Sequence, residues 1–435
     1  MNLRLSKGQL HSGSIEAISS KSYVHRLLIA ASLSDNSVTI HTNIISKDME
    51  ATVGVLRALG ASIDVFSDRF VVNSPVKGIN ESSKNMVKGD DKDTLVLDCI
   101  ESGSTARFIM PIAALLSDKV YMTGSGKLPQ RPFDELVDVL EKHGAKIDST
   151  HLPLTVEGPI APGEYEIAGN VSSQYISGLL FALPLLCDDS RLIITTNLES
   201  SGYVDMTLDV LKMFGIVVNR EDNIFNIPGR QKYHGPSDIK AEGDWSNGAY
   251  LMAFAKVANM MDSSINIDVT GLNDNSLQKD SEIKSIINSI KSITDSIDID
   301  CIQIPDIVPA IALLGAFLNS KSYLRNVERL RIKESDRIES TVKLLSSIGI
   351  KCEVLSDGTH ETLVVHGNAD ILKKQIQGME IDSYNDHRIV MAAAIASLTT
   401  SNGIVINNAS AINKSYPGFF EVLEEKLGMA VTESR

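Results

Sequence analysis

Six segments of the chain share one pattern, a short polar start followed by an apolar run long enough to form a helix. In the first, polar residues from Lys21 lead into the apolar run 27–33, and in the fifth, Asp306 leads into 307–318. The segments start at Lys21, Ser104, Ser172, Trp245, Asp306 and Asp386, in steps of 83, 68, 73, 61 and 80 residues. A pattern that recurs in this way predicts a fold built from repeated supersecondary units.

A second element follows several of these helices, an amphipathic helix that ends in glycine and is followed by alternating apolar residues typical of a hairpin. The glycines are Gly60, Gly144, Gly215 and Gly349. The last two are 134 residues apart, about twice the usual step, so one copy of this element is degenerate. We expect the degenerate copy near 286–293, where no hairpin follows before Asp306.

Each unit therefore has the order strand, apolar helix, strand, amphipathic helix and hairpin, or βαβαββ. With 435 residues, of which 43% are hydrophobic, the chain is long enough for two full-sized domains. We predict an α/β fold of two domains with three units each, and the second domain contains one shortened unit. The first domain is expected to span 20–239, and the second is discontinuous, with 1–19 and 240–435.

The chain is acidic, with a formal net charge of -14, and this opposes binding to nucleic acid, which requires a basic surface. The four cysteines lie far apart, so neither a zinc site nor a disulfide framework is indicated, and a reducing cytoplasm fits best. The first residues lack the apolar core of a signal peptide, and the longest apolar runs are too short for a membrane span. We expect a cytoplasmic protein that binds neither nucleic acid nor membrane.

The polar helix starts are suited to anions, because a helix N-terminus carries unpaired N–H groups and the positive end of the dipole. N-capping would explain the Ser, Asp and Asn residues at these starts. It would not explain the cations beside them, which are Lys21, Arg26, Arg107, Arg131, Arg388 and Lys414. The densest charge run, 329–337, would by itself be read as a solvated helix face. The recurrence of cations at matching points of the repeat favours binding of small anions.

Together these motifs resemble the 5-enolpyruvylshikimate-3-phosphate (EPSP) synthases, a family of enolpyruvyl transferases, along essentially the whole chain. The matching segments are Lys21-Ser22 with Arg26, 103–107, 130–132, 172–174, 304–306, 331–337, 385–388 and Lys414. The resemblance implies two domains of three βαβαββ units each. It also implies transfer of the enolpyruvyl group of phosphoenolpyruvate to the 5-hydroxyl of shikimate 3-phosphate, by addition followed by elimination of phosphate.

The same resemblance implies roles for individual residues. Phosphoenolpyruvate would be bound by Lys21, Gly103, Arg131, Gln174, Arg337, Arg388 and Lys414. Shikimate 3-phosphate would be bound by Ser22, Arg26, Ser172, Ser173, Gln174, Ser200, Tyr203, Asp306 and Lys333. The candidates for proton transfer are Asp306, Glu334, Lys21 and Lys414, and which of them serves each step stays open. No metal and no organic cofactor is implied, and we expect a monomer.

The chain departs from the family pattern at Glu101 and Arg329, where many relatives carry Asn. Two other functions stay open. The sister transferase that acts on UDP-N-acetylglucosamine uses a loop cysteine, which the corresponding stretch 124–132 lacks. A non-catalytic protein that binds phosphorylated metabolites is the second alternative. Asp306 and Glu334 oppose it, because carboxylates weaken an anion pocket unless they do chemistry or orient a hydroxyl.

Overall fold

The computed structural model describes residues 1–74, 94–372 and 379–434. Contacts divide the chain into two compact units, Ser19–Ala241, and Met1–Ile18 with Glu242–Arg435. We call them the 19–241 unit and the 242–435 unit. The domain limits expected from the sequence stay a prediction, because a division by contacts does not test whether each part folds alone. None of the described helices combines the length and the apolar character that a bilayer span needs.

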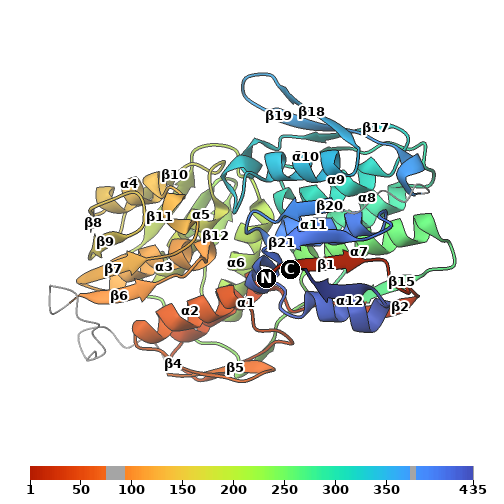
Figure 1. The fold of residues 1–435 in the computed structure, drawn as a ribbon. Helices are drawn as coiled ribbons and strands as arrows, with labels where there is room; N and C mark the ends of the chain where they lie inside the picture. Colours follow the sequence, from red (N-terminus) through yellow and green to blue (C-terminus); the bar gives the residue numbers. More distant parts are fainter. Residues whose placement is uncertain (75–93, 373–378, 435) are drawn as a thin grey trace. The chain divides into compact units, whose positions relative to one another are not determined.

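Three four-stranded sheets form the framework of the 19–241 unit (Figure 1). The first has the order β14-β3-β5-β4, with β14 (Asp238–Lys240), β3 (Val38–His41), β5 (Arg69–Ser74) and β4 (Ser62–Val65). The second has the order β6-β7-β9-β8, with β6 (Leu95–Asp98), β7 (Lys119–Thr123), β9 (Leu154–Glu157) and β8 (Lys146–Ile147). The third has the order β10-β11-β13-β12, with β10 (Glu164–Ile167), β11 (Ser190–Ile194), β13 (Ile224–Ile227) and β12 (Asn219–Glu221). In each sheet the first two strands are parallel and the other neighbours are antiparallel.

Two kinds of helix alternate in this unit, as the sequence predicts. The apolar helices are α1 (Lys21–Leu33), α3 (Gly103–Leu116) and α5 (Ser173–Ala182), and most of their residues are buried. The amphipathic helices are α2 (Lys47–Ala58), α4 (Asp134–Lys142) and α6 (Ser201–Met213), which keep one polar face exposed. Short 3₁₀ helices are η2 (Leu128–Gln130) and η3 (Leu183–Leu185). Ser20, Ser102 and Ser172 cap the apolar helices by accepting a backbone N–H, which fixes where each helix begins.

The 242–435 unit has two four-stranded sheets and one two-stranded sheet. The order β16-β17-β19-β18 joins β16 (Asp298–Asp300), β17 (Lys321–Arg325), β19 (Glu361–His366) and β18 (Lys351–Ser356). The order β20-β21-β1-β22 joins β20 (Met379–Asp382), β21 (Ile404–Asn407), β1 (Leu3–Ser6) and β22 (Ala430–Glu433). The two-stranded sheet pairs β15 (Ile267–Thr270) with β2 (Gly13–Glu16).

The helices of this unit are α7 (Trp245–Met261), α8 (Ile283–Ser289), α9 (Val308–Ala316), α10 (Arg337–Ser347), α11 (His387–Ser397) and α12 (Phe419–Leu427). Its 3₁₀ helices are η4 (Lys279–Glu282), η5 (Pro305–Ile307), η6 (Glu328–Ile332), η7 (Ala369–Leu372) and η8 (Ala409–Lys414). After α8 the chain enters β16, which pairs with β17 in the next sheet. The prediction of one shortened unit without a hairpin is therefore confirmed, and so is the six-unit α/β fold.

Strands β2 and β14 each lead into a helix of one repeat but pair with a strand of another repeat. β2 leads into α1 but pairs in parallel with β15, which follows α7. β14 leads into α7 but pairs in parallel with β3, which follows α1. The strand before α1 therefore belongs to the 242–435 unit, and the strand before α7 belongs to the 19–241 unit. For this reason the 242–435 unit includes the N-terminal residues 1–18 and is discontinuous in sequence.

Candidate active site

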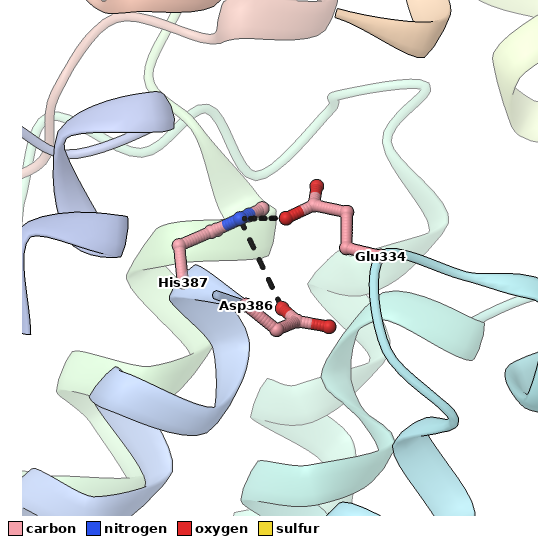
Figure 2. A group of neighbouring side chains, drawn as sticks. All are labelled: Glu334, Asp386 and His387. Atoms are coloured by element: carbon pink, nitrogen blue, oxygen red, sulfur yellow. Dashed lines mark hydrogen bonds and ion pairs between the residues drawn. The ribbon is translucent and has the colours of Figure 1, made fainter. Parts of the chain in front are cut away.

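Glu334, Asp386 and His387 lie together in the 242–435 unit (Figure 2). Asp386 caps α11 by accepting the backbone N–H of Arg388, so His387 stands at the first position of that helix. Glu334 lies between η6 and α10, and its Oε2 is 3.0 Å from Nδ1 of His387. Since an ionised carboxylate can only accept, Nδ1 of His387 donates this hydrogen bond.

Arg337 connects these residues to Asp306. It opens α10 and is buried, with Nε donating to Asp386 over 2.8 Å and one terminal nitrogen donating to Asp306, also over 2.8 Å. Ser335 donates to the same Asp386 carboxylate over 3.0 Å. Glu334 lies 3.9 Å from Arg337, which is farther than its 3.0 Å contact with His387.

Asp306 lies among three cations. Besides Arg337, Lys333 is 3.6 Å away and Arg388 is 3.8 Å away. Burial by itself would raise the pKa of the Asp306 carboxyl, but the charges of these cations outweigh it and hold the pKa well below its usual range. Asp306 belongs to η5, and its carboxylate faces the cation cluster.

The Glu334 carboxyl is held ionised in a similar way. Burial would raise its pKa, but the charge and hydrogen bond of His387, together with Arg337 and Lys414, hold it well below its usual range. Lys414 ends η8, is buried, and donates to the carbonyl of Asn385 over 2.7 Å. The predicted residues Asp306, Lys333, Glu334, Arg337, Arg388 and Lys414 therefore form one electrostatically linked group in this unit.

Glu334, Asp386 and His387 could offer three ligand atoms within 4.8 Å of one another, which raises the question of a metal. Both oxygens of Asp386 already accept hydrogen bonds from the Arg337 guanidinium, at 2.8 and 3.3 Å. A metal cation on this carboxylate would face that guanidinium at close range, and the repulsion opposes binding. The arrangement fits an arginine-neutralised acid cluster better than a metal site.

In the 19–241 unit, Lys21 opens α1 and pairs with Asp48 at the start of α2, over 2.8 Å. One turn further along, His25 contacts Thr52 over 2.6 Å, and Thr52 contacts Thr105 of α3 over 2.7 Å. Burial and the neighbouring cations Lys21 and Arg26 hold the pKa of His25 well below its usual range, so this ring is neutral. These buried contacts fix the starts of α1, α2 and α3 relative to one another.

Arg26 connects α1 to α6. Its guanidinium donates to the Thr207 hydroxyl and to the Tyr203 carbonyl, each over 2.8 Å, and to the Ser22 carbonyl over 2.7 Å. It also stacks at 5.0 Å from the centre of the Phe108 ring. Arg26 is almost completely buried, and with a longer bond to the Ser177 hydroxyl over 3.5 Å it makes four hydrogen bonds to the protein itself. Its contacts therefore already position Tyr203 before any ligand binds.

Gly103, at the start of α3, lies against two arginines. A Cβ atom at this position would be 2.5 Å from a terminal nitrogen of Arg131 and 2.7 Å from one of Arg107. Arg107 donates to the side-chain oxygen of Gln174 over 3.0 Å, and Gln174 donates to the Ser104 hydroxyl over 2.7 Å. The absence of a side chain at Gly103 thus leaves room for two guanidinium groups at a helix N-terminus, an arrangement suited to an anion.

The remaining predicted residues lie at the starts of α5 and α6, which pack against each other. Ser172 caps α5, and Ser173 is the first residue of that helix and is buried. Ser200 has a left-handed backbone with φ of 53° and directly precedes α6, whose first turn contains Tyr203. Ser200 and Tyr203 are therefore positioned by one tight turn.

Several residues of these clusters were not predicted as site residues. Arg107 and His387 belong to the matching segments 103–107 and 385–388, but the resemblance assigns neither of them a ligand or a proton transfer. Asp48 and Asp386 are missing from the predicted set because each acts through a partner 27 or more positions away. Glu101, a departure from the family pattern, lies against Gly126, where φ is +60° and a Cβ atom would be 2.6 Å from the Glu101 carboxylate. No pattern within the sequence reports such contacts.

Fold and site together define a class of protein, an α/β repeat protein in which buried arginines, lysines and ionised carboxylates gather at helix starts, suited to small phosphorylated or carboxylated molecules. Comparisons with known proteins narrow this class. The profile of the family described as EPSP synthase (3-phosphoshikimate 1-carboxyvinyltransferase) matches residues 5–423.

Two curated relatives carry the name 3-phosphoshikimate 1-carboxyvinyltransferase. The protein of Clostridium novyi (strain NT) is 40% identical over 452 residues, which cover 99% of this chain and 98% of that protein. The protein of Clostridium perfringens (strain SM101 / Type A) is 37% identical over 435 residues, with 96% of each covered. A solved EPSP synthase from Acinetobacter baumannii has the same fold, with a TM-score of 0.76 and 21% identity over 99% of this chain and 100% of that one. The chain belongs to the EPSP synthase family.

Proposed function

We propose that this protein transfers the enolpyruvyl group of phosphoenolpyruvate to the 5-hydroxyl of shikimate 3-phosphate and releases phosphate. In the addition, the hydroxyl oxygen bonds to C2 of phosphoenolpyruvate, C3 gains a proton and the hydroxyl loses one. In the elimination, the bond from C2 to the phosphate oxygen breaks, C3 loses a proton and the double bond returns. Membership of the family and the names of its curated relatives support this activity.

The observation that carries the proposal is the pair of ionised carboxylates inside a cation cluster. Asp306 and Glu334 are both held ionised by Arg, Lys and His groups. In a protein that only binds anions, two carboxylates beside the cations would lower the affinity, since they repel the ligand. An enzyme needs them, because addition and elimination require groups that accept and return protons.

The low pKa values of these carboxyls also bear on when they act. A carboxylate whose pKa lies far below neutral is a weak base, so the free protein is poorly prepared for proton transfer. Phosphate and carboxylate groups of the substrates, bound to Lys333, Arg337 and Arg388, would offset the cation charge that lowers both pKa values. We infer that substrate binding itself raises the pKa of Asp306 and Glu334 toward the range where they can exchange protons.

The assignment of ligands to residues is part of the proposal. Phosphoenolpyruvate is assigned to Lys21, Gly103, Arg131, Gln174, Arg337, Arg388 and Lys414. Shikimate 3-phosphate is assigned to Ser22, Arg26, Ser172, Ser173, Gln174, Ser200, Tyr203, Asp306 and Lys333. The hydrogen-bonded contacts of Arg26 and the arginines beside Gly103 support a preformed site within the 19–241 unit. We further propose that the protein is a monomer and that it is cytoplasmic. Its four free cysteines support the second point, because the cytoplasm keeps thiols reduced.

The acceptor distinguishes this proposal from the sister reaction. Purified protein is given phosphoenolpyruvate with either shikimate 3-phosphate or UDP-N-acetylglucosamine, and released phosphate is measured. The proposal expects release with shikimate 3-phosphate alone. Release with the nucleotide sugar alone would assign the protein to the other transferase.

A further inference from the structure

The shortened unit leaves one edge of strand β15 without a strand partner. In the other five sheets the second strand is paired on both sides, as β7 is with β6 and β9. Within the described residues, β15 pairs only with β2. The carbonyls of Asn266 and Thr270 accept from the β2 side. Because a strand directs successive residues to opposite edges, Ile267 and Val269 turn their N–H and C=O groups to the unpaired edge.

A groove of about 450 Å³ runs along this edge. Its lining includes Ile267 and Val269 of β15, Met252 and Ala255 of α7, and Ile287 of α8. Figure 1 shows α7 beside β15. In the complete units a hairpin covers the corresponding side of the second strand. The groove is therefore a direct result of the missing hairpin, and its size is typical of ligand-binding pockets.

Two lysines and two aspartates line the groove, namely Lys256, Lys284, Asp268 and Asp274. Asp268 alternates with Ile267 and Val269 along β15, so its side chain lies on the opposite face of the strand from theirs. Nζ of Lys256 donates to the carbonyl of Ile290 over 2.9 Å, and within the described residues it makes no ion pair. The nearby Asp295 carboxylate accepts instead from the backbone N–H groups of Lys291 and Ser292, at 2.7 and 2.6 Å. Lys284, in contrast, is exposed and pairs with Asp274 over 2.7 Å. An ammonium has three donors, so Lys256 retains two for an incoming carboxylate.

We propose that this groove binds an extended peptide segment of another protein. The segment adds to the unpaired edge of β15 as an antiparallel strand, places apolar side chains against Ile267 and Val269, and presents an acidic side chain to Lys256. Peptides that bind by strand addition use an exposed sheet edge, whose backbone hydrogen bonds supply affinity, and pockets that select alternate side chains.

The test uses fluorescence anisotropy of the full chain with a labelled short peptide of alternating Val and Thr that carries one Glu on its Val-bearing face. Saturable binding is expected. Val269→Pro removes an outward N–H and leaves the β2 pairing intact, so it should weaken binding about tenfold, as one lost hydrogen bond would. Lys256→Gln should have a similar effect. Lys343→Gln alters an exposed lysine of α10 that does not line the groove, so it is the matched control and should leave binding unchanged.

Retained turnover and circular dichroism show that each variant is folded. The proposal is overturned if the peptide does not bind saturably, or if both Val269→Pro and Lys256→Gln bind it as well as the unaltered protein. Light scattering that shows a dimer abolished by Val269→Pro would also overturn it, since the occupant would then be a second copy. Displacement of the peptide by benzoate at equal concentration would overturn it in favour of a small organic acid.

Discussion

Glu334 accepts a hydrogen bond from Nδ1 of His387 over 3.0 Å, across a sequence separation of 53 residues. The pair joins the segment before α10 to the first residue of α11, and the ring is nearly inaccessible to solvent. It requires a proton on Nδ1 of His387, and the ring helps to keep Glu334 ionised. The candidate acid–base group is thus held by an element far from it in the chain.

Replacing Glu334 with Gln should reduce kcat by roughly 10²- to 10⁴-fold, the contribution typical of a positioned acid or base. Ligand affinity should change little, because the amide keeps the shape and the acceptor oxygen that faces His387. Steady-state kinetics and calorimetry with shikimate 3-phosphate measure the two effects separately. Glu339→Gln, on the exposed side of α10, is the control and should leave both unchanged. Lost affinity with unchanged kcat would make the role of Glu334 structural.

Replacing His387 with Gln should move the acidic limb of the kcat/KM profile to higher pH. The positive field and hydrogen bond of His387 lower the pKa of Glu334, so their removal raises that pKa, and the required carboxylate is then protonated at a higher pH. The pH–rate profile measures the shift directly. His360→Gln, which alters an exposed histidine beside Glu328, should leave the limb in place. An acidic limb that stays put in His387→Gln would contradict the coupling.

Replacing Asp386 with Asn should lower the free energy of unfolding at pH 7 by about 1.5–3 kcal/mol, because the buried Arg337 loses its charge-assisted hydrogen bonds to Asp386 and keeps Asp306 as its nearest counter-ion. Asn can still cap α11. Urea unfolding measures the loss. Asp298→Asn breaks an exposed pair with Arg325 and should cost less than about 1 kcal/mol. Equal losses in the two variants would contradict the proposed importance of the buried pair.

The pH dependence of the same pair has a defined sign. Burial would raise the pKa of Asp386, but Arg337 outweighs it and the folded pKa is lowered. Its stabilisation is therefore complete above the unfolded pKa of about 3.9 and is lost as the pH falls through the lower folded pKa. The difference in stability between the unaltered protein and Asp386→Asn should accordingly be largest near neutrality and shrink in acid. A difference that grows in acid would contradict this electrostatic account.

Replacing Gly103 with Ala should raise KM for phosphoenolpyruvate on the order of 10- to 100-fold, since the new Cβ displaces the ends of Arg131 and Arg107 from the start of α3. Stability should change little, because the displaced atoms are the ends of flexible side chains. Gly54→Ala in α2, where a Cβ atom would meet nothing within 4 Å, should leave KM unchanged. Kinetics and thermal unfolding of both variants measure these effects, and an unchanged KM in Gly103→Ala would contradict the assignment.

The fold could be predicted well because its signals are local. Apolar runs recur in all six units, and capping residues such as Ser102 and Asp386 and the glycines that end the amphipathic helices recur in most of them. The missing hairpin is visible as a missing segment. The exchange of β2 and β14 between sheets could not be predicted, because a strand pattern shows which face is buried and not which neighbour lies beside it.

The site could be predicted only as a set of residue types. The sequence indicated cations at helix starts, but the contacts of Arg337 with Asp386 and of Lys21 with Asp48 join separate elements, and helical spacing predicts only neighbours three or four residues apart. Glu334 and Arg337 are three residues apart, a spacing that favours an ion pair between them. In the structure, tertiary packing gives Glu334 a closer partner in His387.

The central claim is that the clustered cations and carboxylates perform enolpyruvyl transfer. Phosphorus NMR of purified protein with equal amounts of phosphoenolpyruvate and shikimate 3-phosphate tests it most directly. We predict that the phosphoenolpyruvate signal is replaced by inorganic phosphate, one equivalent for each enolpyruvyl product, while the phosphate ester of the shikimate ring stays intact. Binding of both compounds with no phosphate released under any condition would contradict the account and leave a metabolite-binding protein.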